Sequence, residues 1–185
     1  MRVVSLALVL AACGGEPPPP PAPPPAPVEA PPAPPPAPAP AAVPAGEPDL
    51  AAMAPDAQKA ELMKAGEVVY KTGGKGGIAC ATCHGEAGAG TPGAFPPLVG
   101  AKDWMGDCKH HAGIVVHGLQ GKIKVAGAEY NGVMTPQGTM LSDFEIAAVI
   151  TYERNSWGND FGICLPADVA AARTAPPPTA PPAAK

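Results

Sequence analysis

Five consecutive residues, Cys80-Ala81-Thr82-Cys83-His84, combine residue types and spacing that suit a defined chemistry. Two thiols three positions apart can add to the two vinyl groups on one edge of a porphyrin, and the adjacent histidine can then bind the iron. Cys-x-x-Cys-His is the attachment pattern of a c-type haem. The sequence therefore predicts one covalently bound haem c, with Cys80 and Cys83 as attachment sites and His84 as the proximal iron ligand.

Two other kinds of site also use closely spaced cysteines. A zinc knuckle needs further ligands at a second regular spacing, whereas Cys108 and Cys164 stand alone in the sequence. A thioredoxin-like redox pair belongs in a βαβ context, which the residues around Cys80 do not provide. We therefore favour the haem interpretation.

The amino-terminal segment has the pattern of an export signal. Arg2 precedes a short apolar run, and Leu10-Ala11-Ala12-Cys13 resembles a bacterial lipobox, whose cysteine is diacylated. We expect residues 1–12 to be a lipoprotein signal peptide and Cys13 to be lipidated. This predicts a protein in the bacterial periplasm or at the cell surface, anchored to a membrane by lipid. An ordinary signal peptide with a chance cysteine is the alternative.

Proline-rich segments flank the central part of the chain. Residues 13–48 are expected to be a linker behind the lipidated cysteine, since more than half of positions 16–48 are proline. Proline fixes φ and lacks an N–H donor, which excludes helix and sheet and favours polyproline II. All aromatic residues fall between positions 57 and 165, so we expect one folded domain over 56–165. The Pro/Ala-rich tail 166–185 is expected to be disordered.

Charge and hydropathy argue against a nucleic-acid partner and against a transmembrane helix. The formal net charge is −4, and the basic residues are scattered singly, which is unlike a nucleic-acid-binding surface. No run reaches the roughly 18 apolar residues of a transmembrane helix.

Helix signals recur through the central part. A first helix is expected to begin at Asp56, as N-cap after Pro55, and to end at Thr72 before two glycines. A second helix is expected over 107–117, with Gly118 as its C-cap.

The clearest helix signal lies near the end of this part. Ser142-Asp143-Phe144-Glu145 is a capping box, and it predicts a last helix that continues to about Ser156. Between the second and last helices, Ile123 and Val125 alternate with lysines, which predicts a small β-hairpin or an extended flap.

Beyond the haem motif, residues 57–160 resemble class I cytochrome c. Gly66 and Tyr70 match the positions where the family's first helix crosses its last helix. Pro96-Pro97-Leu98-Val99-Gly100 matches the family's Pro-x-Leu-x-Gly segment. The resemblance implies an all-α, class I cytochrome c fold around one haem. It also implies that the Pro96 carbonyl accepts a hydrogen bond from His84 Nδ1 and that Leu98 packs on the haem.

The segment from Tyr130 to Pro136 resembles the family's distal loop. By that resemblance Met134 is the second axial iron ligand, and Tyr130 and Asn131 belong to the haem site. This chain departs from the usual Met-Pro pair, because Thr135 intervenes. The remaining competitors for the iron are methionines without the Tyr-Asn-Gly context and histidines that we expect on a helix surface: Met105, Met140, His110, His111 and His117.

A second departure from the family lies between Tyr70 and Cys80. Four glycines fall within this connection, which is longer than in most relatives. We expect it to form a flexible bulge beside the haem edge.

The five cysteines can now be assigned. Lipid accounts for Cys13 and haem for the two cysteines of the motif, which leaves Cys108 and Cys164. An oxidising compartment permits a disulfide between them, and we expect one. Two buried free thiols are the alternative.

The resemblance implies one-electron transfer, because histidine and methionine together leave no open iron position for a substrate. We expect a membrane-tethered periplasmic carrier that feeds or links respiratory complexes. Its partners would be redox proteins of the respiratory membrane, with no nucleic acid and no small-molecule substrate.

Two short segments, 117–121 and 151–159, point to particular groups within the family that the chain resembles. They resemble cytochrome c modules of haem–copper oxidases, quinol-oxidising complexes and membrane-bound alcohol dehydrogenases. A fixed subunit of such an oxidoreductase is therefore the first alternative to a carrier. A haem-based ligand sensor or peroxidase is the second.

Overall fold

The computed structural model describes residues 46–179. The predicted signal peptide, Cys13 and nearly all of the proline-rich linker lie outside the described residues. The helices and strands, in chain order, are η1 (Leu50–Ala52), α1 (Pro55–Thr72), α2 (Ala81–His84), α3 (Lys102–Met105), α4 (Cys108–His117), β1 (Leu119–Val125), β2 (Ala128–Met134), α5 (Asp143–Asn155) and α6 (Pro166–Thr174). The mostly helical fold class is confirmed. Among helices within 46–179, none is both long and apolar enough to span a membrane.

The N-cap of helix α1 lies two positions earlier than the sequence predicted. Its N-cap is Ala54 and Pro55 is its first residue, so Asp56 lies inside the first turn and is not the cap. Proline suits the first helical position because the N–H it lacks would have no partner there. The predicted end is confirmed, since Thr72 is followed by Gly73 in the left-handed region at φ 83°.

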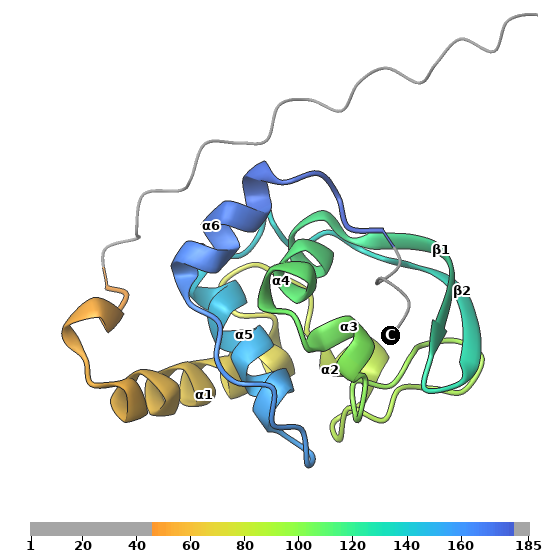
Figure 1. The fold of residues 1–185 in the computed structure, drawn as a ribbon, viewed down its shortest axis with the longest axis horizontal. Coiled ribbons are helices and arrows are strands. Elements are labelled where there is room, and N and C mark those ends of the chain that lie inside the picture. The colour runs from red at the N-terminus through yellow and green to blue at the C-terminus, as the bar shows by residue number, and fades with distance from the viewer. Residues whose placement is uncertain (1–45, 180–185) are drawn as a thin grey trace, which may run out of the picture. The chain divides into compact units, whose positions relative to one another are not determined.

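Helix α5 begins with the capping box that the sequence predicted. The Ser142 side chain accepts a hydrogen bond from the Glu145 N–H, and the Glu145 carboxylate accepts one from the Ser142 N–H at 3.0 Å. Helix α1 crosses α5 at Gly66, where a Cβ atom would collide with the Ala148 carbonyl. Glycine therefore permits the close approach of these two helices, which are labelled in Figure 1.

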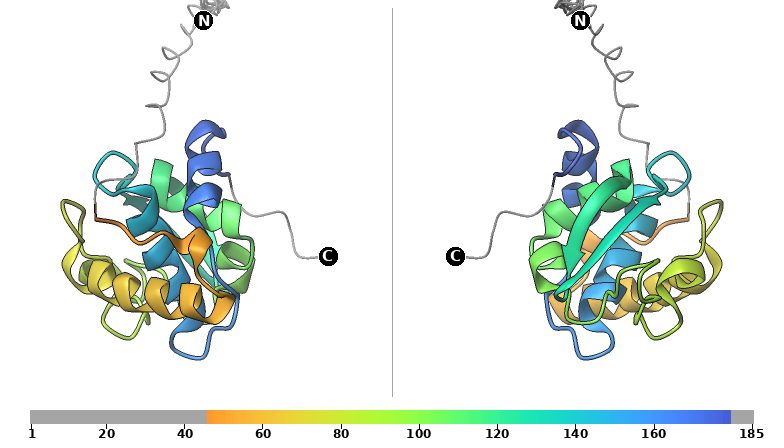
Figure 2. Two further views of the ribbon diagram at one scale, coloured as in Figure 1. Left: turned by 90° about the vertical axis from the view of Figure 1, so that its left-hand side faces the viewer. Right: turned by 90° about the vertical axis from the view of Figure 1, so that its right-hand side faces the viewer.

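The predicted hairpin is confirmed, as strands β1 and β2 pair antiparallel from Leu119↔Met134 to Val125↔Ala128. It faces the viewer in the right-hand view of Figure 2 and lies across the domain from α1 in Figure 1. The indole Nε1–H of Trp104 on α3 donates to the Lys124 carbonyl at 2.9 Å. This bond holds the hairpin against α3.

The expectation of a disordered tail from residue 166 is wrong over 166–174, which form α6. Val169 and Ala172 are buried, and α6 packs against α4 and α5. Arg173 donates to the Gly138 carbonyl and to the Asp143 carboxylate. Composition alone missed this helix, because packing rather than propensity stabilises it.

Two further connections fix the helices that surround the site. Cys108, the first residue of α4, forms a disulfide with Cys164, with 5.8 Å between their Cα atoms. The glycine-rich connection after α1 is not the free bulge that we expected. The Lys75 N–H donates to the Glu145 carboxylate and the Ile78 N–H donates to the Gln137 side chain, each at 2.9 Å.

Candidate functional site

A cavity of about 200 Å³ lies between α2, the hairpin, α3, α4 and α5. Its walls are mostly apolar. The residues that line it include Cys80, Cys83, His84, Leu98, His111, Tyr130, Met134 and Glu153. The cavity therefore gathers nearly all of the predicted haem-site residues from segments far apart in the sequence.

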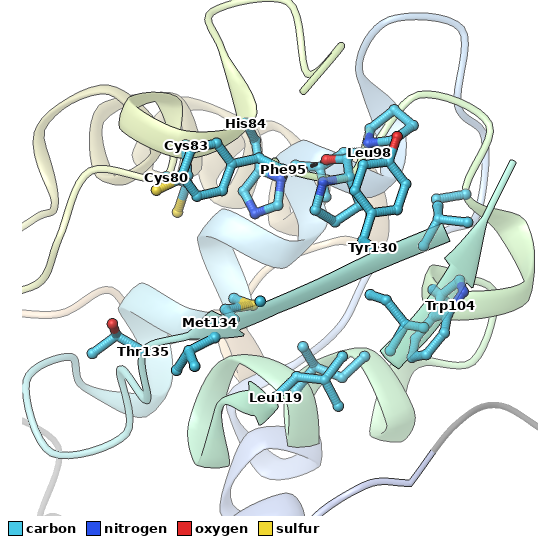
Figure 3. A pocket seen from close by; sticks show the side chains of 18 of the residues that line it. Cys80, Cys83, His84, Phe95, Leu98, Trp104, Leu119, Tyr130, Met134 and Thr135 are labelled. Atoms are coloured by element: carbon cyan, nitrogen blue, oxygen red, sulfur yellow. Dashed lines mark hydrogen bonds between the residues drawn. The ribbon is translucent and has the colours of Figure 1, made fainter. Parts of the chain in front are cut away.

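The thiols of Cys80 and Cys83 and the imidazole of His84 come from the short helix α2 and its N-cap. Both cysteines are unpaired and half-buried, while His84 is buried. Figure 3 shows the two sulfur atoms beside the His84 ring at one side of the cavity. One helical turn thus presents both attachment groups and the proximal ligand to the same space.

A hydrogen bond fixes the His84 ring. Nδ1–H donates to the Pro96 carbonyl at 2.9 Å, which is the bond that the resemblance implied. The loop that brings Pro96 close depends on Gly90, which lies at φ 66° and leaves no room for a Cβ beside the Phe95 carbonyl. Because a carbonyl can only accept, Nδ1 carries the proton and Nε2 is the nitrogen available to a metal.

Met134 lies across the cavity from His84, and the two side chains face the same space in Figure 3. It is the last residue of β2, where it pairs with Leu119, whereas the resemblance had placed it in a loop. Of the two competing methionines, Met105 also lines the cavity and Met140 does not. The thioether therefore comes from the end of a paired strand.

The remaining predicted residues divide into two groups. Leu98 and Tyr130 line the cavity, as the resemblance implied. Asn131 does not line it; this side chain is exposed and its residue pairs with Lys122 in the hairpin. Successive side chains of a strand point to opposite faces, so inward Tyr130 turns Asn131 outward.

Sequence reasoning missed two ionisable side chains in the cavity wall. We expected His111 on a helix surface, but it is only 4% exposed and lines the cavity. Glu153 on α5 is 3% exposed and also lines it. A signal was available, because Glu153 follows Ile146 and Val149 at helical spacing and so falls on the apolar face.

The Glu153 carboxylate perturbs its neighbours. Burial, and secondly the negative charge of Glu153, raise the pKa of the Cys80 thiol above its ordinary value. The same two causes raise the pKa of Tyr70, whose hydroxyl donates to the Gly85 carbonyl at 2.6 Å. Both groups are consequently protonated near neutral pH in the protein without haem.

The donor set fits a haem c. Two thiols at the required spacing and one imidazole lie on one side of an apolar cavity, and a thioether lies on the other. Imidazole and thioether are a known axial pair for haem iron, and apolar walls suit a porphyrin. Cys80 and Cys83 would hold the group covalently, and His84 and Met134 would ligate its iron.

Comparison with known proteins agrees with this chemistry. A family model described as "Cytochrome c" matches residues 63–157, which is just over half of the chain. Two curated proteins named "Cytochrome c-552", one from Thermus thermophilus and one from a specified strain of that species, are each 44% identical over 86 residues. The match covers 43% of this chain but 63% and 56% of those relatives, so the chain spans less than two thirds of their length.

Proposed function

Because the chain belongs to the cytochrome c family, we propose that it transfers single electrons through a covalently bound haem c. The observation that carries this proposal is the placement of His84 and Met134 on opposite sides of one apolar cavity. If His84 and Met134 both ligated the iron, they would leave it no open position for a substrate, which would suit electron transfer rather than bond chemistry.

Each residue has a distinct task in this proposal. Cys80 and Cys83 fix the haem edge through thioether bonds. His84 binds the iron through Nε2, and its bond to Pro96 keeps the ring in place and raises its basicity. The Met134 thioether raises the reduction potential relative to a second imidazole. The bound haem c supplies an iron that changes charge by one electron.

We further propose that the protein works at a membrane outside the cytoplasm. The lipobox-like segment ending at Cys13 and the proline-rich residues 16–48 support this placement, although both lie outside the described residues except for the last three. Lipid at Cys13 would anchor the chain, and a polyproline spacer would hold the haem domain near redox proteins of the respiratory membrane.

Carbon monoxide binding tests the saturated iron site. The absorption spectrum of ferrous, haem-loaded protein at neutral pH should not change when carbon monoxide is added. The same protein should be reduced and reoxidised reversibly by one electron. Rapid formation of a carbon monoxide complex would contradict the proposal and would favour a ligand sensor or a peroxidase.

A further inference from the structure

A buried histidine–carboxylate pair lies in the cavity wall and has no task in the function proposed above. His111 Nε2 on α4 and Glu153 Oε2 on α5 are 3.0 Å apart, and each side chain is 4% exposed. Both residues line the cavity that the haem would fill. A charge at this position acts on the iron through protein rather than through water, so it is weakly screened.

The pair retains a free base. When His111 Nε2–H donates to the carboxylate, Nδ1 carries the lone pair of the neutral ring. Within the part of the chain that the structure describes, this buried Nδ1 has no hydrogen-bond partner. It is therefore the atom that can accept a proton, giving an imidazolium beside the Glu153 carboxylate.

Other titratable or charged side chains lie on the elements that pack against the pair. The titratable or charged side chains on the packed elements include Tyr70 on α1, Cys80, Cys83 and His84 around α2, Lys102 and Asp103 on α3, Asp107, Lys109, His110 and His117 around α4, Tyr130 on β2, Asp143, Glu145, Tyr152 and Arg154 on α5, and Asp168 and Arg173 on α6. The haem would occupy both thiols and His84. Burial raises the pKa of Tyr70 far above neutrality.

The two buried arginines have other partners. Arg154 donates to main-chain carbonyls, including those of Met105 and Phe161. Arg173 binds Asp143. The Glu153 carboxylate thus has two side-chain partners, His111 and the Cys80 thiol, and the haem would take up the thiol.

We propose that the His111–Glu153 pair binds one proton when the bound haem c accepts an electron. The electron comes from the redox donor and the proton comes from solvent to His111 Nδ1, where one N–H bond forms; oxidation reverses both steps. The net charge near the iron then stays constant through the cycle. This inference rests on the proposed electron transfer.

The direction follows from electrostatics. An added electron makes the haem less positive, so a nearby site binds a proton more tightly. Reduction is therefore favoured at low pH, and the midpoint potential falls as pH rises.

The test is an optical redox titration of haem-loaded protein from about pH 5 to about pH 9, the range in which histidine commonly titrates. The wild-type midpoint potential should decrease as the pH is raised through this range. The limiting slope is a tenfold change in the reduction constant per pH unit, or about 59 mV for one electron. Glu153→Gln and His111→Gln should each flatten that slope. His110→Gln is the matched control, because it removes the neighbouring histidine outside the cavity wall, and it should retain the wild-type slope.

A second measurement needs no variant. Wild-type protein reduced in weakly buffered solution should take up protons from the solution, up to one per electron, and a pH-indicator dye reports this uptake. The measurement tests the inference even if a variant fails to incorporate haem. An unchanged slope in both cavity variants, as titrating haem propionates would give, overturns the inference, as does reduction without proton uptake. If the protein is reduced reversibly but its midpoint potential does not change with pH, this inference alone is contradicted. Carbon monoxide binding contradicts the proposed function.

Discussion

His84 is held at both its ring and its main chain. Nδ1–H donates to the Pro96 carbonyl at 2.9 Å, and the His84 carbonyl accepts from the Gly90 N–H at 2.8 Å. The same loop returns to the Gly88 carbonyl through the Leu98 N–H at 2.7 Å. The proximal side of the site is therefore preorganised, while the identity of the distal ligand depends on a single thioether.

Replacement of that thioether gives a direct prediction. Met134→Ala should abolish the near-infrared sulfur-to-iron charge-transfer band of the oxidised protein and lower its midpoint potential, because thioether ligation raises the potential. Met140→Ala is the matched control, since Met140 does not line the cavity. Met105→Ala tests the other methionine that lines the cavity, and loss of the band in that variant with retention in Met134→Ala would assign the ligand to Met105.

At the scale of helices, the approach of α1 to α5 depends on one missing side chain. A Cβ at Gly66 would overlap main-chain atoms of Ala148, which cannot move aside as a flexible side chain could. Tyr70, one turn further along α1, packs on Tyr152 and Trp157 with ring centroids 5.5 and 5.1 Å away. The crossing thus combines close backbone contact with aromatic packing.

Gly66→Val should therefore lower the free energy of unfolding of the haem-loaded protein by about 3 kcal/mol or more, the upper range for overpacked cores. Gly76→Ala is the control, because its nearest neighbour, the Met140 carbonyl, would be 3.5 Å from the new Cβ. Denaturant titration followed by absorbance measures both. If the two variants had equal free energies of unfolding, α1 would be able to shift away from α5 without loss of stability.

The disulfide acts at the same scale, because it joins the start of α4 to the segment that leads into α6. The double variant Cys108→Ala, Cys164→Ala should lose up to about 4 kcal/mol of unfolding free energy, the chain-entropy value for a loop of this size. Guanidinium titration without reductant measures this loss. Peptide mapping of the native protein should recover the linked pair, and two alkylatable thiols there would contradict the bridge.

For the whole molecule, the tether and the haem domain should be separable. Residues within 46–179 line the cavity, so we expect the proposed anchor at Cys13 to be unnecessary for the haem site. An anchor instead raises the effective concentration of the domain for partners in the same membrane. Its loss should change delivery of electrons and leave the redox site unchanged.

Cys13→Ser should accordingly move the protein from the membrane to the soluble fraction, with an unchanged spectrum and midpoint potential. Deletion of residues 17–44 with Cys13 retained should keep the protein on the membrane and slow respiratory oxygen uptake by membranes that carry it. An unchanged rate would indicate permanent docking, as in a fixed oxidoreductase subunit, or a spacer without a role.

The sequence by itself determined what depends on neighbouring residues. The spacing from Cys80 to His84 identified the haem chemistry, and local hydrogen bonds within the Ser142–Glu145 capping box located the start of α5. Gly118 likewise marked the end of α4. Such signals survive without tertiary structure because each partner lies within one helical turn.

Only the tertiary structure decided which polar groups are buried and which weak helix forms. Helix α6 is too short to be stable alone, and it persists because Val169 and Ala172 pack on α4 and α5. His111 and Glu153 come from two helices that are far apart in the sequence, so neither residue could reveal its partner locally. Burial of the Glu153 carboxylate is tolerated because a distant segment supplies a hydrogen-bond partner, and that pairing exists only once the chain has folded.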